Sequence, residues 1–194
     1  MAASGPLMVA LYSFRALLAH SPAFQTWVAS GGGEANATEA MRHVHVMMYP
    51  EVPFTGIYSP EQFAVQSRPG VMLTFYDKRN RGGKPWVARR VGMGSYAVRG
   101  KLLLQIENDY EPPPDGDMND LLVRFDNTIG AVLNDIRSLS GQVYYLTASD
   151  IAAGARGIII RSISPLMPRV ASDFAESMAV GCKVEASYIV EFGT

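Results

Sequence analysis

Histidine and cysteine side chains bind metals or act as bases and nucleophiles near neutral pH, and this 194-residue chain has three histidines and one cysteine. His43 and His45 have the i, i+2 spacing that places two side chains on one face of a strand. Zinc needs three or four ligands, and no cysteine or paired carboxylate lies near this pair, so we expect surface or interface histidines and no metal. Cys182 lies between Gly181 and Lys183 at the mouth of a predicted strand, with no base or orienting group beside it. We therefore expect an inert small residue there.

A glycine pattern, Gly92-Met93-Gly94-Ser95-Tyr96-Ala97, has the letters of a dinucleotide-binding motif. That site requires a helix after the glycines, whose free N–H groups face the pyrophosphate. A strand is predicted to follow here, so we expect a turn or bulge between two strands. The chain also has no nucleophile elbow, zinc-protease, Walker or calcium-loop motif, and we expect no enzyme activity, no catalytic residue and no cofactor.

Charged residues are segregated along the chain. Eight basic residues and no acidic one lie between Lys78 and Lys101, and six acidic residues and no basic one lie between Glu107 and Asp120. If one subunit offers the basic hairpin and the next offers the acidic loop, a head-to-tail contact can repeat around a ring. The candidate interface residues are Arg79, Arg81, Lys84, Arg89, Arg90, Glu107, Asp109, Glu111, Asp115 and Asp117.

Several alternatives to a charged interface stay open. The two blocks could be solvated faces, because exposed charge pairs contribute little stability, or the acidic loop could line a channel. Arginines of the basic segment, with Trp86 and Tyr96 between them, could bind nucleic acid, although the net charge of −1 argues against this. A small-molecule-binding module or cryptic hydrolase would use His43, His45 and a carboxylate inside a curved sheet.

Composition favours an assembling protein. The chain is 48% hydrophobic and 18% charged, which is apolar for a monomer and indicates additional buried surface, as in an oligomer. The first residues lack a basic region, and Tyr12, Ser13 and Arg15 interrupt their apolar stretch, so we expect no signal peptide, no membrane span and an intracellular protein when made.

Helices are predicted at the N-terminus and in the middle of the chain. Residues 4–29 carry an apolar stripe, and Ser21-Pro22 predicts the start of a second short helix. The helix at about 117–138 has the clearest period, with acidic residues at its start and Gly141 at its end. Its stripe predicts the burial of Met118, Leu121, Leu122, Phe125, Ile129, Val132, Leu133 and Ile136.

The remaining periodic segments predict strands around an extended Pro-containing connection at about 50–69. We expect strands at 38–49, 71–77, 85–91, 96–106, 143–146, 157–163 and 184–192, with the second to fourth forming an antiparallel meander, and a polar loop at about 168–173. This order predicts one α+β domain over 1–194, an antiparallel or mixed sheet with its helices packed on one face.

The order of elements resembles a known family. An N-terminal helix followed by Phe24–Trp27, a middle run of strands, and an acidic loop before Phe125-Asp126-Asn127-Thr128-Ile129-Gly130 occur in turn. A final alternating strand closes on Phe192-Gly193. This pattern is similar to the tail terminator or tail-completion (neck) proteins of long-tailed bacteriophages.

The resemblance implies a structural virion protein, located in the tail or neck and assembled in the host cytoplasm. Members of that family form a ring, usually of six subunits, that caps the tail tube and joins it to the head-tail connector. The implied partners are further copies of the chain, the tail tube protein and a connector or stopper protein. DNA would pass through the channel without sequence-specific binding, and no membrane is involved.

Overall fold

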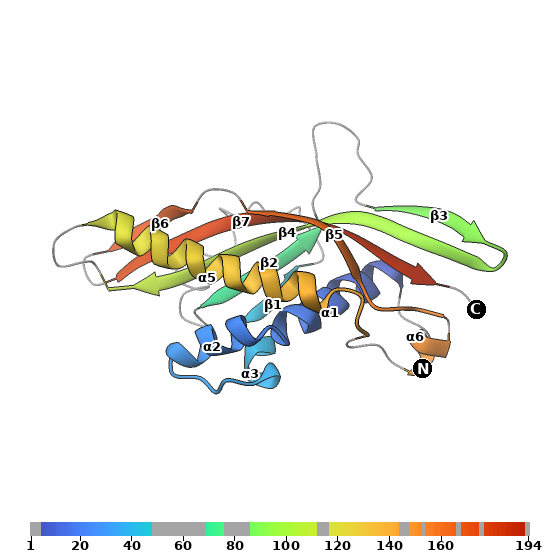
Figure 1. The fold of residues 1–194 in the computed structure, drawn as a ribbon, viewed down its shortest axis with the longest axis horizontal. Helices are drawn as coiled ribbons and strands as arrows, with labels where there is room; N and C mark the ends of the chain where they lie inside the picture. Colours follow the sequence, from blue (N-terminus) through green and yellow to red (C-terminus); the bar gives the residue numbers. More distant parts are fainter. Residues whose placement is uncertain are drawn as a thin grey trace.

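One mixed sheet and the helices packed on it make up the fold, which Figure 1 shows as an elongated molecule. The structure, a computed structural model, describes residues 5–47, 69–75, 86–111, 117–143, 148–152, 154–165, 168–174 and 177–192. Its helices are α1 (Pro6–Ala19), α2 (Pro22–Ser30), α3 (Ala37–Arg42), α5 (Met118–Leu139) and α6 (Ala148–Ala152). Its strands are β1 (Val44–Met47), β2 (Gly70–Phe75), β3 (Trp86–Gly92), β4 (Ser95–Tyr110), β5 (Ile159–Pro165), β6 (Arg169–Phe174) and β7 (Ser177–Phe192).

Two long antiparallel strands, β4 and β7, form the centre of the sheet. Each has 16 residues, and their register runs from Tyr96 opposite Phe192 to Tyr110 opposite Met178. Strands β2 and β3 pair with successive parts of β4 along its outer edge, and β5 and β6 do the same along the outer edge of β7. Strand β1 is parallel to β2 and extends the sheet beyond it. At about 3.3 Å per residue, β4 and β7 are each about 50 Å long.

The core lies on one face of this sheet. Successive residues of a strand point to opposite faces, and the even-numbered residues of β4 and β7 point to the face that α1, α2 and α5 cover. Buried side chains on this face of the two strands include Val98, Leu102, Leu104, Ile106, Val180, Cys182, Val184, Ala186, Tyr188 and Val190. They form one hydrophobic cluster with the buried residues of α1, α2 and α5.

Helix α5 lies along the sheet and is the best-defined amphipathic element. Asp117 is its N-cap, and the carboxylate accepts a hydrogen bond from the backbone N–H of Asn119. Phe125, on the buried stripe, lies edge-on to Trp27 of α2 and to Tyr110 of β4, with ring centroids 5.8 and 6.4 Å away. The buried residues of α5 are Leu121, Phe125, Ile129, Val132, Leu133 and Ile136, while Met118 and Leu122 are partly buried against the core. The predicted helix is therefore confirmed, as is the α+β class, and the predicted burial holds for six of the eight stripe residues.

The predicted strand at 38–49 is wrong in its first half. Residues 37–42 form helix α3, because the side chain of Asn36 accepts a hydrogen bond from the backbone N–H of Glu39 and caps the first turn. The strand begins only at Val44. The alternation of Val44 and Val46 correctly predicts a strand for these residues, whereas the residues before them follow the cap at Asn36 and are helical.

The predicted polar loop at 168–173 is also wrong. Strand β6 occupies Arg169–Phe174 and pairs antiparallel with the start of β7, from Arg169 opposite Gly181 to Phe174 opposite Ser177. Polar residues such as Ser172 and Asp173 are compatible with an edge strand. Val143, for which the sequence predicts a strand, lies outside any strand and is exposed, and residues 144–146 fall outside the described residues.

The predicted meander has the wrong pairing. Strands β2 and β3 do not pair with each other; both pair with β4, β3 with its first half and β2 with its second half. Strand β4 extends four residues past the predicted end, since Glu107–Tyr110 continue the pairing with β7. The predicted connection at 50–69 lies outside the described residues except for Pro69.

Candidate interface

The hairpin of β3 and β4 carries the described part of the basic segment at one end of the molecule. Its turn is Met93-Gly94, and Gly94 has a φ of +80°, a conformation that favours glycine. The register shifts between Arg90 and Gly92, so the strand has a bulge just before the turn. The glycine pattern is therefore a strand connection, as predicted, with no helix after it. Figure 1 shows the hairpin projecting beyond the layer of helices α1, α2 and α5.

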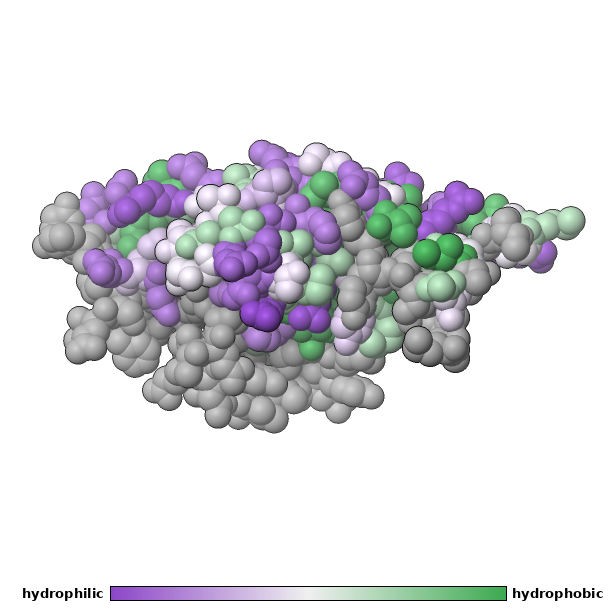
Figure 2. All heavy atoms as spheres, turned by 90° about the horizontal axis from the view of Figure 1, so that it is seen from below, coloured by the Kyte–Doolittle hydropathy of each residue, from purple (hydrophilic) through white to green (hydrophobic). Residues whose placement is uncertain are grey.

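Large apolar side chains are exposed on this hairpin. Met93 at the turn is 91% exposed, and Val87 and Val91 on β3 are 57% and 52% exposed. Tyr96 is partly exposed and stacks on Phe192, with ring centroids 5.0 Å apart. In Figure 2 the tapered end of the molecule shows hydrophobic and hydrophilic residues side by side. Exposed apolar residues gathered on a projecting element are typical of a contact surface.

The arginines of the hairpin point to both of its faces. Arg89 is opposite Ala97 and Arg90 is opposite Tyr96, so the two adjacent side chains lie on different faces. Both are exposed, and the Nε of Arg90 donates a hydrogen bond to the carbonyl of Gly92 at 3.1 Å. Arg99, opposite Val87, adds a third exposed guanidinium on the face of Arg89. Among the described residues, none of the three forms an ion pair.

The acidic segment lies at the opposite end of the sheet. Glu111 follows the last residue of β4 and is exposed. Asp117 is exposed and caps α5, and Asp120 in the first turn of α5 forms an ion pair with Arg124, with an N–O distance of 3.1 Å. Carboxylates at the N-terminus of a helix also interact favourably with its dipole. Asp117 and Asp120 therefore have a role in the helix as well as a place on the acidic surface.

Glu107 and Asp109 are not in a loop, which corrects the prediction for both. They belong to β4, opposite Gly181 and Ala179 of β7. Glu107 is only 7% exposed, and its carboxylate accepts a hydrogen bond from the side-chain amide of Gln105. A Cβ at Gly181 would lie 2.9 Å from Cγ of Glu107, so the glycine makes room for the glutamate side chain. A side chain this buried does not present its charge to a neighbouring molecule, so we remove Glu107 from the interface.

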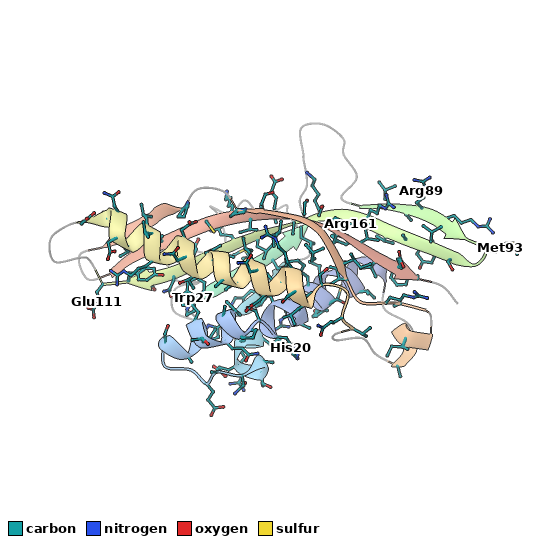
Figure 3. The ribbon with its side chains drawn as sticks, viewed as in Figure 1. His20, Trp27, Arg89, Met93, Glu111 and Arg161 are labelled. Atoms are coloured by element: carbon teal, nitrogen blue, oxygen red, sulfur yellow. The ribbon has the colours of Figure 1, made fainter. Side chains whose placement is uncertain are left out.

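The length of β4 separates the two charged regions. Arg89 lies opposite residue 97 and Glu111 follows residue 110, which places them about 45 Å apart along the strand. Figure 3 shows Arg89 and Met93 at one end of the molecule and Glu111 at the other. Electrostatic screening acts over about 8 Å at physiological ionic strength, so these charges do not stabilise each other within one chain. A second molecule is required to bring them together.

Four candidate residues lie outside the described residues: Arg79, Arg81, Lys84 and Asp115. The described interface candidates are thus Arg89, Arg90, Asp109, Glu111 and Asp117. Sequence reasoning missed the apolar component of the same hairpin. The sequence does place Val87 and Val91 at alternate positions of a predicted strand, which puts both on one face. No described helix covers that face, so both side chains are exposed.

The two neighbouring histidines do not share a strand face. His43 is the C-cap of α3, where its Nδ1 donates to the carbonyl of Pro69 at 2.6 Å and its Nε2 lies 3.9 Å from Oε1 of Glu39. His45 is in β1, where burial, and then Coulomb interactions with Arg15 and His43, lower its pKa. His43 therefore has a structural role. No group of three or more histidine, cysteine or acidic residues placed to hold a metal occurs in the described parts of the chain.

Cys182 lies within β7, not at the mouth of the strand. Its side chain points into the core opposite Ile106, and it is 5% exposed. Burial, and to a smaller degree the carboxylate of Asp126, raises the pKa of its thiol to about 12. The thiolate is the reactive form of cysteine, so this environment keeps the sulfur unreactive.

Comparison with known proteins adds no family. A scan against protein-family models finds no match, and a search of curated proteins finds none either. Within the described ranges, no helix is long and apolar enough to span a membrane.

Proposed function

We propose that the chain is a structural subunit that assembles head-to-tail into a ring, as a tail terminator or neck protein of a long-tailed bacteriophage. The supporting observation is that the basic, partly apolar hairpin and the acidic end of β4 lie at opposite ends of one elongated subunit. Complementary surfaces on opposite ends give a heterologous contact, which repeats from copy to copy and closes when the rotation between copies allows it.

Both components of the hairpin contribute to such a contact. Burial of Val87, Val91 and Met93 against a neighbour supplies the hydrophobic free energy, at about 25 cal/mol per Å² of apolar surface. The arginines select the acidic end of the neighbour and oppose contact between two hairpins, because like charges across an interface cost several kcal/mol. This division of roles favours one orientation at every junction.

In the phage assembly we propose, the ring has about six copies and caps the tail tube. The tail tube protein contacts one side of the ring, and the connector or stopper protein contacts the other. DNA passes through the centre without sequence-specific contacts. These partners and the location in the virion rest on the resemblance of the sequence pattern.

Charge reversal on the hairpin tests the junction. The double variant Arg89→Glu/Arg90→Glu should shift the protein from a closed oligomer to a monomer in mass photometry, with an unchanged circular dichroism spectrum. Arg161→Glu is the control for a single charge reversal, because Arg161 is an exposed arginine on β5, outside the hairpin (Figure 3). Wild-type assembly should also weaken as salt is raised. An oligomer that survives the double reversal would contradict the charged junction.

Compensating changes at the acidic end provide the second arm of this test. Glu111→Lys/Asp115→Lys, added to the reversed hairpin, should restore part of the assembly, whereas on their own they should weaken it. Asp117 is left unchanged because its side chain caps α5. Electron microscopy of the wild type should show a ring with a central channel. A wild-type protein that stays monomeric at all concentrations would contradict the proposed function itself.

A further inference from the structure

In the part of the sheet that the structure describes, β1, β3, β5 and β6 each pair on one side only, and two of these edge strands, β3 and β6, lie at opposite ends of the molecule. Among the described residues, β3 pairs only with β4, and β6 pairs only with β7. Strand β3 lies on the outer edge of β4 beside its first half, whereas β6 lies on the outer edge of β7 beside the second half of β4. Such edges expose rows of backbone N–H and C=O groups, which readily pair with a strand of another chain.

We propose that β3 of one subunit pairs edge to edge with β6 of the next, so that the sheet continues from subunit to subunit. This inference rests on the proposed function and specifies the backbone contact at the junction. The two strands have similar lengths, seven residues in β3 and six in β6. Addition of a strand to a sheet edge is a common mode of protein recognition, in which main-chain hydrogen bonds give the affinity.

Charge complementarity identifies the occupant as a second copy of this chain. Strand β3 carries Arg89 and Arg90, whereas β6 carries one charge of each sign, Arg169 and Asp173, and lies at the acidic end, where its partner β7 also pairs with Asp109 of β4. A β3–β6 junction therefore brings the basic hairpin next to the acidic end of the neighbour. Pairing of β3 with another β3 would instead place arginines beside arginines, which is unfavourable.

Exposure of the β3 side chains points to the same junction. Residues 87–91 are exposed, including two valines on a strand with no helix over it. Natural proteins protect such edges or use them for assembly. Pairing with β6 would supply hydrogen-bond partners for the backbone groups at the outer edge of β3. It would also partly cover side chains on both faces of β3, which are exposed to solvent in the monomer.

Cysteine cross-linking in the full-length protein tests the pairing. One cysteine replaces Val87 of β3, and a second replaces either Ser172 or Asp173 of β6, because consecutive residues of a strand point to opposite faces. With a short bis-maleimide linker, at least one of the two double variants should give a ladder of covalent oligomers on a denaturing gel. Wild type, whose Cys182 is buried, and each single-cysteine variant should give no ladder. The matched control is Val87→Cys/Ser164→Cys, with Ser164 exposed on β5, and it should give no ladder either.

The outcomes separate the pairing from the ring. A closed oligomer with no β3–β6 ladder would overturn the strand pairing and leave the ring intact. Cross-linking that stops at a dimer would support the pairing and overturn the ring. Covalent dimers from Val87→Cys alone would show that β3 pairs with β3. A monomer at all concentrations, with no cross-links, would overturn both proposals.

Hydrogen exchange provides a readout without cysteines. In the wild-type oligomer, amides in 86–92 and 169–174 should exchange at least tenfold more slowly than in the Arg89→Glu/Arg90→Glu monomer. Amides in the centre of β4 and β7 should show no change and serve as the internal control. Equal exchange of the two edge strands in both states would overturn the pairing.

Discussion

The hydroxyl of Ser21 donates a hydrogen bond to Oδ2 of Asp135 at 2.7 Å, although the two residues are 114 positions apart in the chain. The same carboxylate oxygen accepts a hydrogen bond from the backbone N–H of Ala23 at 2.8 Å. Ser21 is also the N-cap of α2, and its Oγ accepts from the backbone N–H of Phe24. One carboxylate thus joins the start of α2 to the last part of α5 and lies where the dipole of α2 favours a negative charge.

Removal of this carboxylate should destabilise the fold without affecting assembly surfaces. Asp135→Ala should lower the free energy of unfolding by about 1.5–3 kcal/mol, the usual range for hydrogen bonds to a charged group. Urea denaturation followed by circular dichroism measures the change. Asn127→Ala, at an exposed position on the same helix, is the control and should cost less than about 0.5 kcal/mol. Equal losses in the two variants would show that the link is not stabilising.

The buried ring of Phe125 should contribute more than any polar contact of α5. The side chain is 0% exposed and lies between Trp27 and Tyr110. Phe125→Ala should therefore cost about 3–5 kcal/mol in a denaturant titration. Val123→Ala, at an exposed position on the opposite face of α5, should have little effect. A loss below about 1 kcal/mol for Phe125→Ala would place the ring outside the core.

Residues 118–139 could be predicted from the sequence because local pattern and final environment agree there. The apolar stripe repeats through the whole helix, and Asp117 supplies a cap at its start. By contrast, α3 is short and its residues also fit a strand, so the side-chain cap of Asn36 decided the outcome. The Ser21–Asp135 link has no local signal, because it depends on how α2 and α5 pack.

The candidate interface likewise combines features that the sequence predicts with features that depend on contacts distant in the chain. The charge blocks are visible in the sequence, but their distance is set by the length of β4, which includes polar residues such as Asn108 and Asp109. Those residues resemble a loop by type and are held in the strand by pairing with β7. The burial of Glu107 depends on a glycine 74 positions later, Gly181, that leaves space across the strands. Non-local pairing of this kind leaves no periodic signal in either segment.

Two glycines should respond in opposite ways to the same substitution. A Cβ at Gly157 would lie 2.1 Å from the carbonyl oxygen of Gln142, where the chain leaving α5 passes close to the start of β5. Gly157→Ala should therefore destabilise the fold by more than about 2 kcal/mol, as expected when backbone must move in a packed region. Gly130 lies inside α5 with open space around it, so Gly130→Ala should raise stability by about 0.5–1 kcal/mol. Thermal melts of the two variants measure both changes, and a stable Gly157→Ala variant would contradict this close approach.

The buried thiol of Cys182 should make stability decrease at alkaline pH. Its pKa is raised to about 12 in the folded chain, chiefly by burial, whereas a thiol in an unfolded chain has a pKa of about 8.5. Between these values the folded state holds a proton that the unfolded state has lost, so the free energy of unfolding falls as pH rises above about 8.5. Burial also raises the pKa of Tyr110 and Tyr188, and both phenols act in the same direction at higher pH.

A cysteine-free variant isolates the contribution of the thiol. Cys182→Ala should lose some packing energy at every pH, so the comparison concerns the slope of the free energy of unfolding between pH 7.5 and pH 10 and not its absolute value. That slope should be shallower in the variant, because the thiol no longer contributes a proton that is lost on unfolding. Because Cys182 is buried, a thiol reagent at pH 8 should react with the native wild-type protein only as fast as the protein unfolds. In denaturing urea, the same reagent should react with Cys182 immediately. Rapid reaction with the native protein, or identical slopes in the two proteins, would mean that Cys182 is accessible to solvent and that β7 does not direct it into the core.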